Sequence, residues 1–149
     1  MIYTNSDGGC RGNPGPGAIG ILVREEGEIL QTYSSMVGSY VTNNIAEYEA
    51  LIQALKMASK YTKEITCFLD SELIVKQLLG QYKVKDKKLL KLFLEVQKLQ
   101  KNFSQVRYKH VKRWNKFQKI VDGLLNRELE QHGYPKYKSE EWIKQKIGN

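Results

Sequence analysis

Four acidic residues stand within or beside apolar runs of this 149-residue chain: Asp7, Glu47, Asp70 and Asp122. Burying a carboxylate without a positive partner costs free energy, because the charge loses its hydration. Any fold of the chain must therefore supply these charges with a counter-charge. If the four side chains converge, they form a site for hard divalent cations, and this convergence is the arrangement that we expect.

Among the four acids, Glu47 has the sequence context that most clearly indicates burial. Small and apolar residues follow it at helical spacing, namely Ala50, Leu51, Ala54, Leu55 and Ala58. This spacing places Glu47 at the head of the core-facing stripe of a helix. A capping box is the alternative, with Asn44 as the N-cap residue and Glu47 three positions later.

The other three acids also have structural explanations. Asp7 precedes Gly8 and Gly9, as an aspartate in a turn does. Asp70 follows an apolar strand and precedes a helix, which is an N-cap position. Asp122 fits the rim of an amphipathic helix. The functional interpretation therefore depends on all four acids occurring together.

Length and composition indicate one soluble globular domain. The 149 residues suffice for one buried core, 41% of them are hydrophobic, and no apolar run approaches the roughly 18 residues of a membrane span. The N-terminus lacks the features of a secretory signal, and the two cysteines lack metal-ligand spacing. We expect a cytoplasmic monomer with reduced thiols and no affinity for membranes.

Positive charge is concentrated in one segment. The net charge is +8, and residues 83–119 contain 13 Lys or Arg and 2 Asp or Glu, whereas the rest of the chain has 11 basic and 14 acidic residues. A basic segment beside an acidic site suits a polyanion that lysines hold and metal ions process. A solvated, lysine-rich helix face is the alternative.

The hydrophobic periodicity predicts a mixed α/β domain. Strands are expected at residues 1–6, 18–24, 28–36, 65–69 and 105–111, and helices at 44–60, 71–79, 86–102, 118–131 and 139–147. The first three strands would form an antiparallel meander. Residues 8–17 are rich in glycine and proline and are predicted to be a loop.

Three of the acids lie within longer motifs. Asp7–Gly17 contains an aspartate followed by a G-N-P-G loop, Thr42–Leu51 reads T-N-N-I-A-E-Y-E-A-L, and Asp70–Lys85 begins with the third acid. From Tyr3 to about Leu129, these motifs make the chain resemble the type 1 ribonucleases H. The resemblance implies a ribonuclease H-like fold, in which a five-stranded mixed sheet, three strands antiparallel and the others parallel, is flanked by helices. The domain would comprise residues 1–132, followed by a C-terminal tail, 133–149, with a short helix.

The resemblance also implies a function. The chain would be an endonuclease that hydrolyses the RNA strand of RNA/DNA hybrids with little sequence dependence, giving 5′-phosphate and 3′-hydroxyl ends. Asp7, Glu47, Asp70 and Asp122 would bind two Mg²⁺ ions, for which Mn²⁺ can substitute, with Asp7 bridging the pair. The substrate would be bound by Gly8, Cys10, Arg11, Asn13, Thr42, Asn43, Asn44, Glu72, Lys83 and Lys85, with Lys87, Lys88 and Arg113 nearby.

The region before Asp122 departs from the family pattern. Gln118 occupies the position at which the family usually has Asn, and the preceding loop lacks the histidine that many relatives have there. Trp114 in that loop would contact a sugar or base, or else pack partly in the core. The basic, tryptophan-bearing hairpin that some relatives insert before the next helix is missing after Lys83.

Two other functions fit parts of the sequence. One is a module that binds hybrids without cutting them, and the other is a recombinase or resolvase that uses the same architecture on DNA. Retention of all four acids argues against the first. The G-N-P-G and T-N-N-x-A-E segments argue against the second.

Overall fold

The computed structural model describes residues 1–135 of the chain. The elements follow one another as β1 (Ile2–Cys10), β2 (Gly15–Glu25), β3 (Glu28–Val41), α1 (Asn43–Ala58), β4 (Glu64–Leu69), α2 (Glu72–Leu78), α3 (Lys87–Gln100), β5 (Gln105–His110) and α4 (Lys116–Gln131). No helix in this range is long and apolar enough to cross a bilayer. The helix expected at 139–147 lies outside the described residues.

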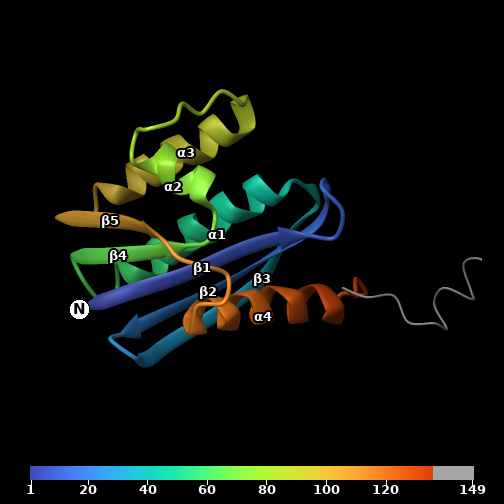
Figure 1. Ribbon diagram of the computed structural model, residues 1–149, viewed down its shortest axis with the longest axis horizontal. Coiled ribbons are helices and arrows are strands. Elements are labelled where there is room, and N and C mark those ends of the chain that lie inside the picture. The colour runs from blue at the N-terminus through green and yellow to red at the C-terminus, as the bar shows by residue number, and fades with distance from the viewer. Residues whose placement is uncertain (136–149) are drawn as a thin grey trace, which may run out of the picture.

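The five strands form one mixed sheet in the order β3-β2-β1-β4-β5 (Figure 1). β2 pairs antiparallel with both β1 and β3, whereas β4 pairs parallel with both β1 and β5. This pattern confirms the predicted α/β fold, with its antiparallel meander and its parallel strands. Because β1 and β4 run in the same direction, their carboxyl ends meet at one edge of the sheet.

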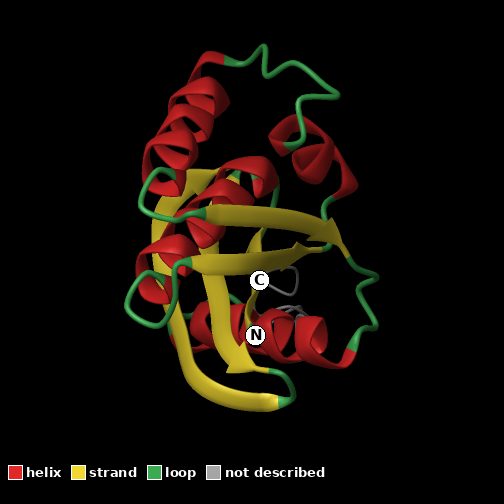
Figure 2. Ribbon diagram, turned by 90° about the vertical axis from the view of Figure 1, so that its left-hand side faces the viewer, coloured by secondary structure: helices red, strands yellow, loops and turns green. Residues whose placement is uncertain are grey.

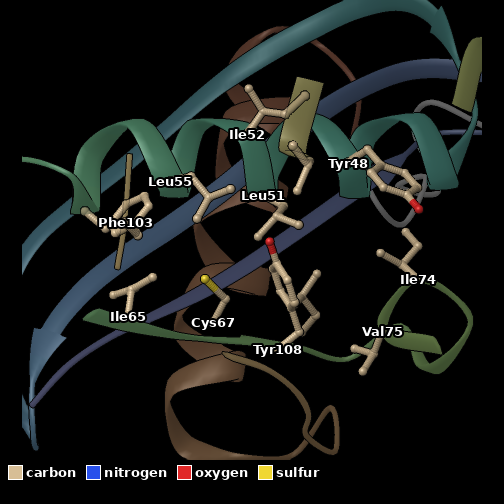
Figure 3. Packing of buried hydrophobic residues seen from close by; sticks show 13 residues of the cluster. Tyr48, Leu51, Ile52, Leu55, Ile65, Cys67, Ile74, Val75, Phe103 and Tyr108 are labelled. Atoms are coloured by element: carbon tan, nitrogen blue, oxygen red, sulfur yellow. The ribbon is translucent and has the colours of Figure 1, made fainter. Parts of the chain in front are cut away.

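Helices cover both faces of the sheet (Figure 2). On one face α1 packs against β1, β2 and α3, and on the other α4 packs against β1, β2 and β3. The main core lies beneath α1, where Leu51 of α1 and Cys67 of β4 face each other (Figure 3). On the other face, Leu125 and Leu129 of α4 pack against Ala18 of β2 in a smaller apolar cluster.

The glycine-rich segment 8–17, which was predicted to be a loop, is mostly strand. β1 continues to Cys10 and β2 begins at Gly15, so that only residues 11–14 turn. β3 likewise extends to Val41, because it pairs with the lengthened β2. The loop prediction was wrong because most of these glycines make room for neighbouring backbone, while pairing with adjacent strands keeps the segment extended.

Two glycines let a helix approach the sheet closely. A Cβ atom on Gly8 would lie 2.2 Å from the carbonyl carbon of Ala46 in α1. A Cβ atom on Gly20 would lie 2.2 Å from the carbonyl oxygen of Val121 in α4. Gly8 follows Asp7 in β1, and Gly20 is the β2 partner of Asp7. The absence of a side chain at these two positions therefore brings the backbones of both helices close to Asp7.

We expect Gly20→Ala to lower the free energy of unfolding by about 1–3 kcal/mol, because the added methyl group must push α4 away from β2. Urea denaturation followed by circular dichroism measures this change. Gly27→Ala is the matched control, since nothing lies within 4 Å of the Cβ position at Gly27. Equal loss of stability in the two variants would contradict the close approach of α4.

Candidate active site

Three acidic side chains meet at the edge of the sheet where β1 and β4 end. Asp7 lies within β1 and not in a turn, Asp70 directly follows β4, and Glu47 lies near the start of α1. One ligand oxygen from each carboxylate lies within 4.8 Å of the others. The parallel pairing of β1 with β4 brings the two aspartates together, and Gly8 admits the start of α1 beside them.

Burial makes ionisation of these carboxylates unfavourable. Asp7 and Glu47 are only 5% and 8% exposed, and the Oε2 atom of Glu47 has no hydrogen-bond partner. Burial is the main cause that raises the pKa of Asp7 to about 8 and the pKa of Glu47 well above its usual range. The charge of Asp7 raises the pKa of Glu47 further, and the charge of Asp70 raises the pKa of both.

Asp122 approaches this cluster from the exposed surface of α4. Its charge contributes to the raised pKa of Asp7. The pKa of Asp70 is raised chiefly by burial, while Arg113 lowers it and Asp122 raises it again. Asp122 therefore acts electrostatically on the buried acids, although it is not a member of the close cluster of three.

A cleft of about 450 Å³ opens beside these side chains, and all four acids line it. Its other lining residues are Gly8, Gly9, Cys10, Arg11, Asn43, Asn44, Ser71, Arg113, Leu125 and Asn126. The close cluster offers carboxylate oxygens alone, which are ligands that Mg²⁺ and Mn²⁺ prefer, whereas zinc favours nitrogen and sulfur. The buried and unpartnered Oε2 atom of Glu47 therefore fits a hard divalent cation.

Comparisons with known proteins agree with this geometry. The family model described as Reverse transcriptase-like matches residues 5–121. Ribonuclease HI of Halobacterium salinarum is 35% identical over 131 residues, which cover 87% of this chain and 64% of that protein. The crystal structure of RNase H1 from the same archaeon matches 87% of this chain and 98% of that chain, with a TM-score of 0.81 and 32% identity. The chain belongs to the type 1 ribonuclease H family.

In two further comparisons, the chain spans very different shares of the matched protein. LC11-RNase H1, crystallised in complex with RNA/DNA hybrid, is 33% identical and matches 89% of this chain and 99% of its own, with a TM-score of 0.82. A bifunctional protein of Mycobacterium tuberculosis is 38% identical over 115 residues, 75% of this chain but 31% of that protein. The chain thus spans about a third of that relative, and less than two thirds of the halobacterial enzyme.

The structure divides the predicted substrate-binding residues between two clefts. Gly8, Cys10 and Arg11 line the cleft of the acids. Asn13, Thr42, Lys87 and Lys88 line a second cleft of about 890 Å³ between the start of α1 and the start of α3. Asn43 and Asn44 line both clefts. A surface that runs from the acids across the start of α1 to α3 therefore carries most of the predicted contacts.

Three predicted substrate contacts lie apart from both clefts. Glu72, Lys83 and Lys85 are exposed and line neither of them. Glu72 instead forms an ion pair of 3.0 Å with Lys76, one turn further along α2. These three positions are not brought together with the acids, and their roles in substrate binding stay predictions.

The N-cap residues of α1 and α2 are not Asn44 and Asp70, the residues considered for these roles from the sequence. Thr42, and not Asn44, is the N-cap residue of α1, and its hydroxyl accepts a hydrogen bond from a backbone N–H of the first turn. Ser71, and not Asp70, caps α2 in the same way. Both capping alternatives are excluded, because a hydroxyl residue close to Asn44 and another next to Asp70 take these roles. The carboxylates of Glu47 and Asp70 are thus available to a cation.

Trp114 is 69% exposed, so its partial burial in the core is excluded. It lies in the loop between β5 and α4, where the ammonium of Lys112 is 5.8 Å from the centre of its ring. Of the two histidines, His110 ends β5 as the strand partner of Leu69, so that it neighbours Asp70, whereas His132 follows α4. Neither lines the cleft of the acids.

Two lining residues of the acid cleft that have polar side chains, Ser71 and Asn126, received no role from the sequence. Asn126 lies one turn after Asp122, and its side chain donates to the Asp122 carbonyl oxygen and accepts from Arg11, both at 2.9 Å. Arg11 also donates to the Tyr134 carbonyl oxygen at 2.9 Å. The four-residue spacing from Asp122 was the signal that could have identified Asn126, because residues one turn apart share a helix face.

Without metal, the stability of the protein should decrease as the pH rises. Folding raises the pKa of Asp7 from 3.8 to about 8, so the folded state binds this proton more tightly than the unfolded chain. The contribution of Asp7 to stability should therefore fall as the pH rises from about 4 toward about 8. In Asp7→Asn, the free energy of unfolding should fall less over this pH range, because asparagine does not titrate. Thermal denaturation in EDTA across this pH range measures the difference.

Adding Mn²⁺ is the complementary measurement at alkaline pH. A cation that binds only the folded state raises the melting temperature, and the increase should be larger for the wild type than for Asp7→Asn. If Mn²⁺ raised both melting temperatures equally, Asp7 would not be a ligand.

Proposed function

We propose that the chain is an endoribonuclease that hydrolyses the RNA strand of RNA/DNA hybrids with bound divalent cations. The observation that carries this proposal is the close cluster of Asp7, Glu47 and Asp70, whose ligand oxygens lie within 4.8 Å of one another beside an open cleft. The complex of LC11-RNase H1 with RNA/DNA hybrid supports the substrate. A module that only binds hybrids would have no need for such costly buried acids.

The four acids would hold two Mg²⁺ ions, for which Mn²⁺ can substitute. Asp7 on the central strand, Glu47 and Asp70 beside it, and Asp122 across the cleft would supply the carboxylate ligands. When bound, the ions would acidify the attacking water and stabilise the departing 3′ oxygen, which leaves 5′-phosphate and 3′-hydroxyl ends.

The second cleft suits the DNA strand of the hybrid. Lys87 and Lys88 at the start of α3 supply positive charge for its phosphates. Tyr40, which is 77% exposed, also lines this cleft and offers a ring on which a sugar or base can stack. We therefore expect the hybrid to place its RNA strand over the acids and its DNA strand over the start of α3.

Asparagine side chains connect the two clefts. The side-chain oxygen of Asn13 accepts from the Asn43 N–H at 2.9 Å, and the side-chain oxygen of Asn43 accepts from the Cys10 N–H at 3.1 Å. These bonds hold the turn after β1 against the start of α1. Both asparagines are exposed, so their amide NH₂ groups can donate to phosphate or sugar oxygens.

Recognition of RNA requires a contact with the 2′-hydroxyl group. The backbone of residues 8–10 and the side chain of Asn44 line the cleft beside the acids, and these groups can donate to or accept from that hydroxyl. Backbone, amide and lysine groups contact sugars and phosphates and carry no base information. Cleavage should therefore depend little on sequence.

The proposed catalytic unit is residues 1–132, acting as a monomer. α4 ends at Gln131 and its C-cap residue is His132, so this range includes every element that carries an acid. Residues 133–149 would be an appended tail.

Labelled RNA/DNA hybrid, RNA duplex and DNA duplex, each incubated with Mg²⁺, Mn²⁺ or EDTA, test the proposal. We expect cleavage of the RNA strand of the hybrid only, and none in EDTA. Asp7→Asn should lower the rate by at least about a hundredfold, because it removes charge where cations and the transition state need it. Hybrid binding, measured by fluorescence anisotropy, should survive in this variant.

Glu130→Gln is the matched control, because it removes one acidic charge from the exposed surface of α4 outside the cleft. It should cleave at the wild-type rate. Cleavage in EDTA, or full activity of Asp7→Asn, would overturn the assignment of the acids. Binding without any cleavage by the wild type would instead indicate a hybrid-binding module.

A further inference from the structure

Two amide side chains are buried between β1 and α4. Gln118 in α4 has no exposed surface and Asn5 in β1 is 1% exposed. The Nε2 atom of Gln118 donates to the carbonyl oxygen of Ser6 at 2.8 Å, and its Oε1 atom accepts from the Nδ2 atom of Asn5 at 3.2 Å. Buried amides are stable only with such partners, and these bonds join the helix directly to the central strand.

Arg24 determines the direction of this chain of hydrogen bonds. Its Nε atom donates to the Oδ1 atom of Asn5 at 3.1 Å, and a guanidinium has donors alone. Asn5 must therefore present its NH₂ group to Gln118, which in turn presents its own NH₂ group to Ser6. The guanidinium is itself held between aromatic rings, 4.1 Å from the centre of Phe117 and 4.6 Å from that of Tyr3.

Both ends of this connection lie next to the acids. Ser6 immediately precedes Asp7, and Gln118 lies one helical turn before Asp122. The Val121 carbonyl, adjacent to Asp122, rests against Gly20, the strand partner of Asp7. The hydrogen bonds of Gln118 are thus placed where they set how α4 is rotated and shifted relative to β1.

Apolar contacts alone would not fix the rotation and shift of α4 relative to β1. α4 is also seated by Leu125 and Leu129 against Ala18, but hydrophobic contacts have no preferred direction. Hydrogen bonds from an amide have a defined length and angle. A ligand such as Asp122, which stands outside the close cluster of three acids, needs this kind of restraint to meet the same cations.

We propose that Gln118 is a positioning residue, which holds Asp122 at the distance and rotation from Asp7 that cation binding requires. The inference rests on the proposed function, because it takes Asp122 as a cation ligand. It also gives a physical role to the position at which the sequence departs from the family's usual Asn. The longer side chain reaches across the interface to the strand backbone while Asn5 satisfies its oxygen.

Gln118→Met tests the inference, because methionine has a similar volume and lacks the amide. Isothermal titration calorimetry with Mn²⁺ alone should show an affinity about tenfold to a hundredfold lower than that of the wild type, the usual effect of losing a group that orients a metal ligand. The measurement is made at a temperature at which circular dichroism shows the variant to be folded. In the cleavage assay kcat should fall while KM for the hybrid stays unchanged.

A double-mutant cycle shows whether Gln118 acts through Asp122. In an Asp122→Asn background, Gln118→Met should have no further effect on Mn²⁺ affinity. Val96→Ala is the control for loss of stability alone, because Val96 is a fully buried apolar residue of α3 on the opposite face of the sheet. This control should melt at a lower temperature and bind Mn²⁺ like the wild type.

Asn5→Leu is a second variant that leaves the bond from Gln118 to Ser6 in place. It should weaken Mn²⁺ binding in the same direction as Gln118→Met, and by a smaller factor. The positioning role would be overturned if Gln118→Met and Asn5→Leu both bound Mn²⁺ with wild-type affinity. It would also be overturned if Gln118→Met weakened Mn²⁺ binding equally in the wild-type and the Asp122→Asn backgrounds. Absence of Mn²⁺ binding by the wild type would instead contradict the proposed function itself, so the two failures are distinguishable.

Discussion

Repulsion among buried carboxylates is the constraint around which this molecule is arranged. Asp7 and Glu47 are almost fully buried, and Asp70 lies beside them at the end of β4. Burial and mutual repulsion both disfavour their ionised forms. Under the proposed function, divalent cations would supply the positive charge that offsets this cost.

The pairing of the strands, together with Gly8 and Gly20, brings the acidic side chains close to one another. Parallel pairing sets Asp7 and Asp70 at one edge, and Gly8 and Gly20 let helices reach that edge from both faces. Glu47 is carried by α1, whose N-terminal backbone packs directly on Gly8, and it is as buried as the strand residue that it meets. Asp122 is carried by α4 and stays exposed. The fourth acid is thus held by different means from the other three, through a helix tied to β1 by buried amides.

Under the proposed function, the two clefts would separate the catalytic acids from part of the substrate-binding surface. All four acids line the first cleft, together with Arg11 and Arg113, whereas Lys87, Lys88 and Tyr40 line the second. They share Asn43 and Asn44 at the start of α1, so a single helix terminus adjoins both. Positive charge in the segment 83–119 contributes to these surfaces unevenly, because that segment extends over α3, β5 and the start of α4. Lys87 and Lys88 reach the second cleft, whereas Lys83 and Lys85 do not.

Local patterns in the sequence determined which elements form and which acids matter. Helical and alternating periodicities identify all nine elements within residues 1–135, and the position of Glu47 ahead of an apolar stripe indicates its burial, because these signals depend only on near neighbours along the chain. Tertiary structure alone decided that residues 8–10 and 15–17 are strand, that Thr42 and Ser71 cap the helices, and that Gln118 bonds to Ser6. The strand extension and the bond of Gln118 depend on partners that are distant in sequence. The caps depend on a choice between neighbouring residues that can each cap a helix. Local periodicity encodes neither the distant partners nor this choice.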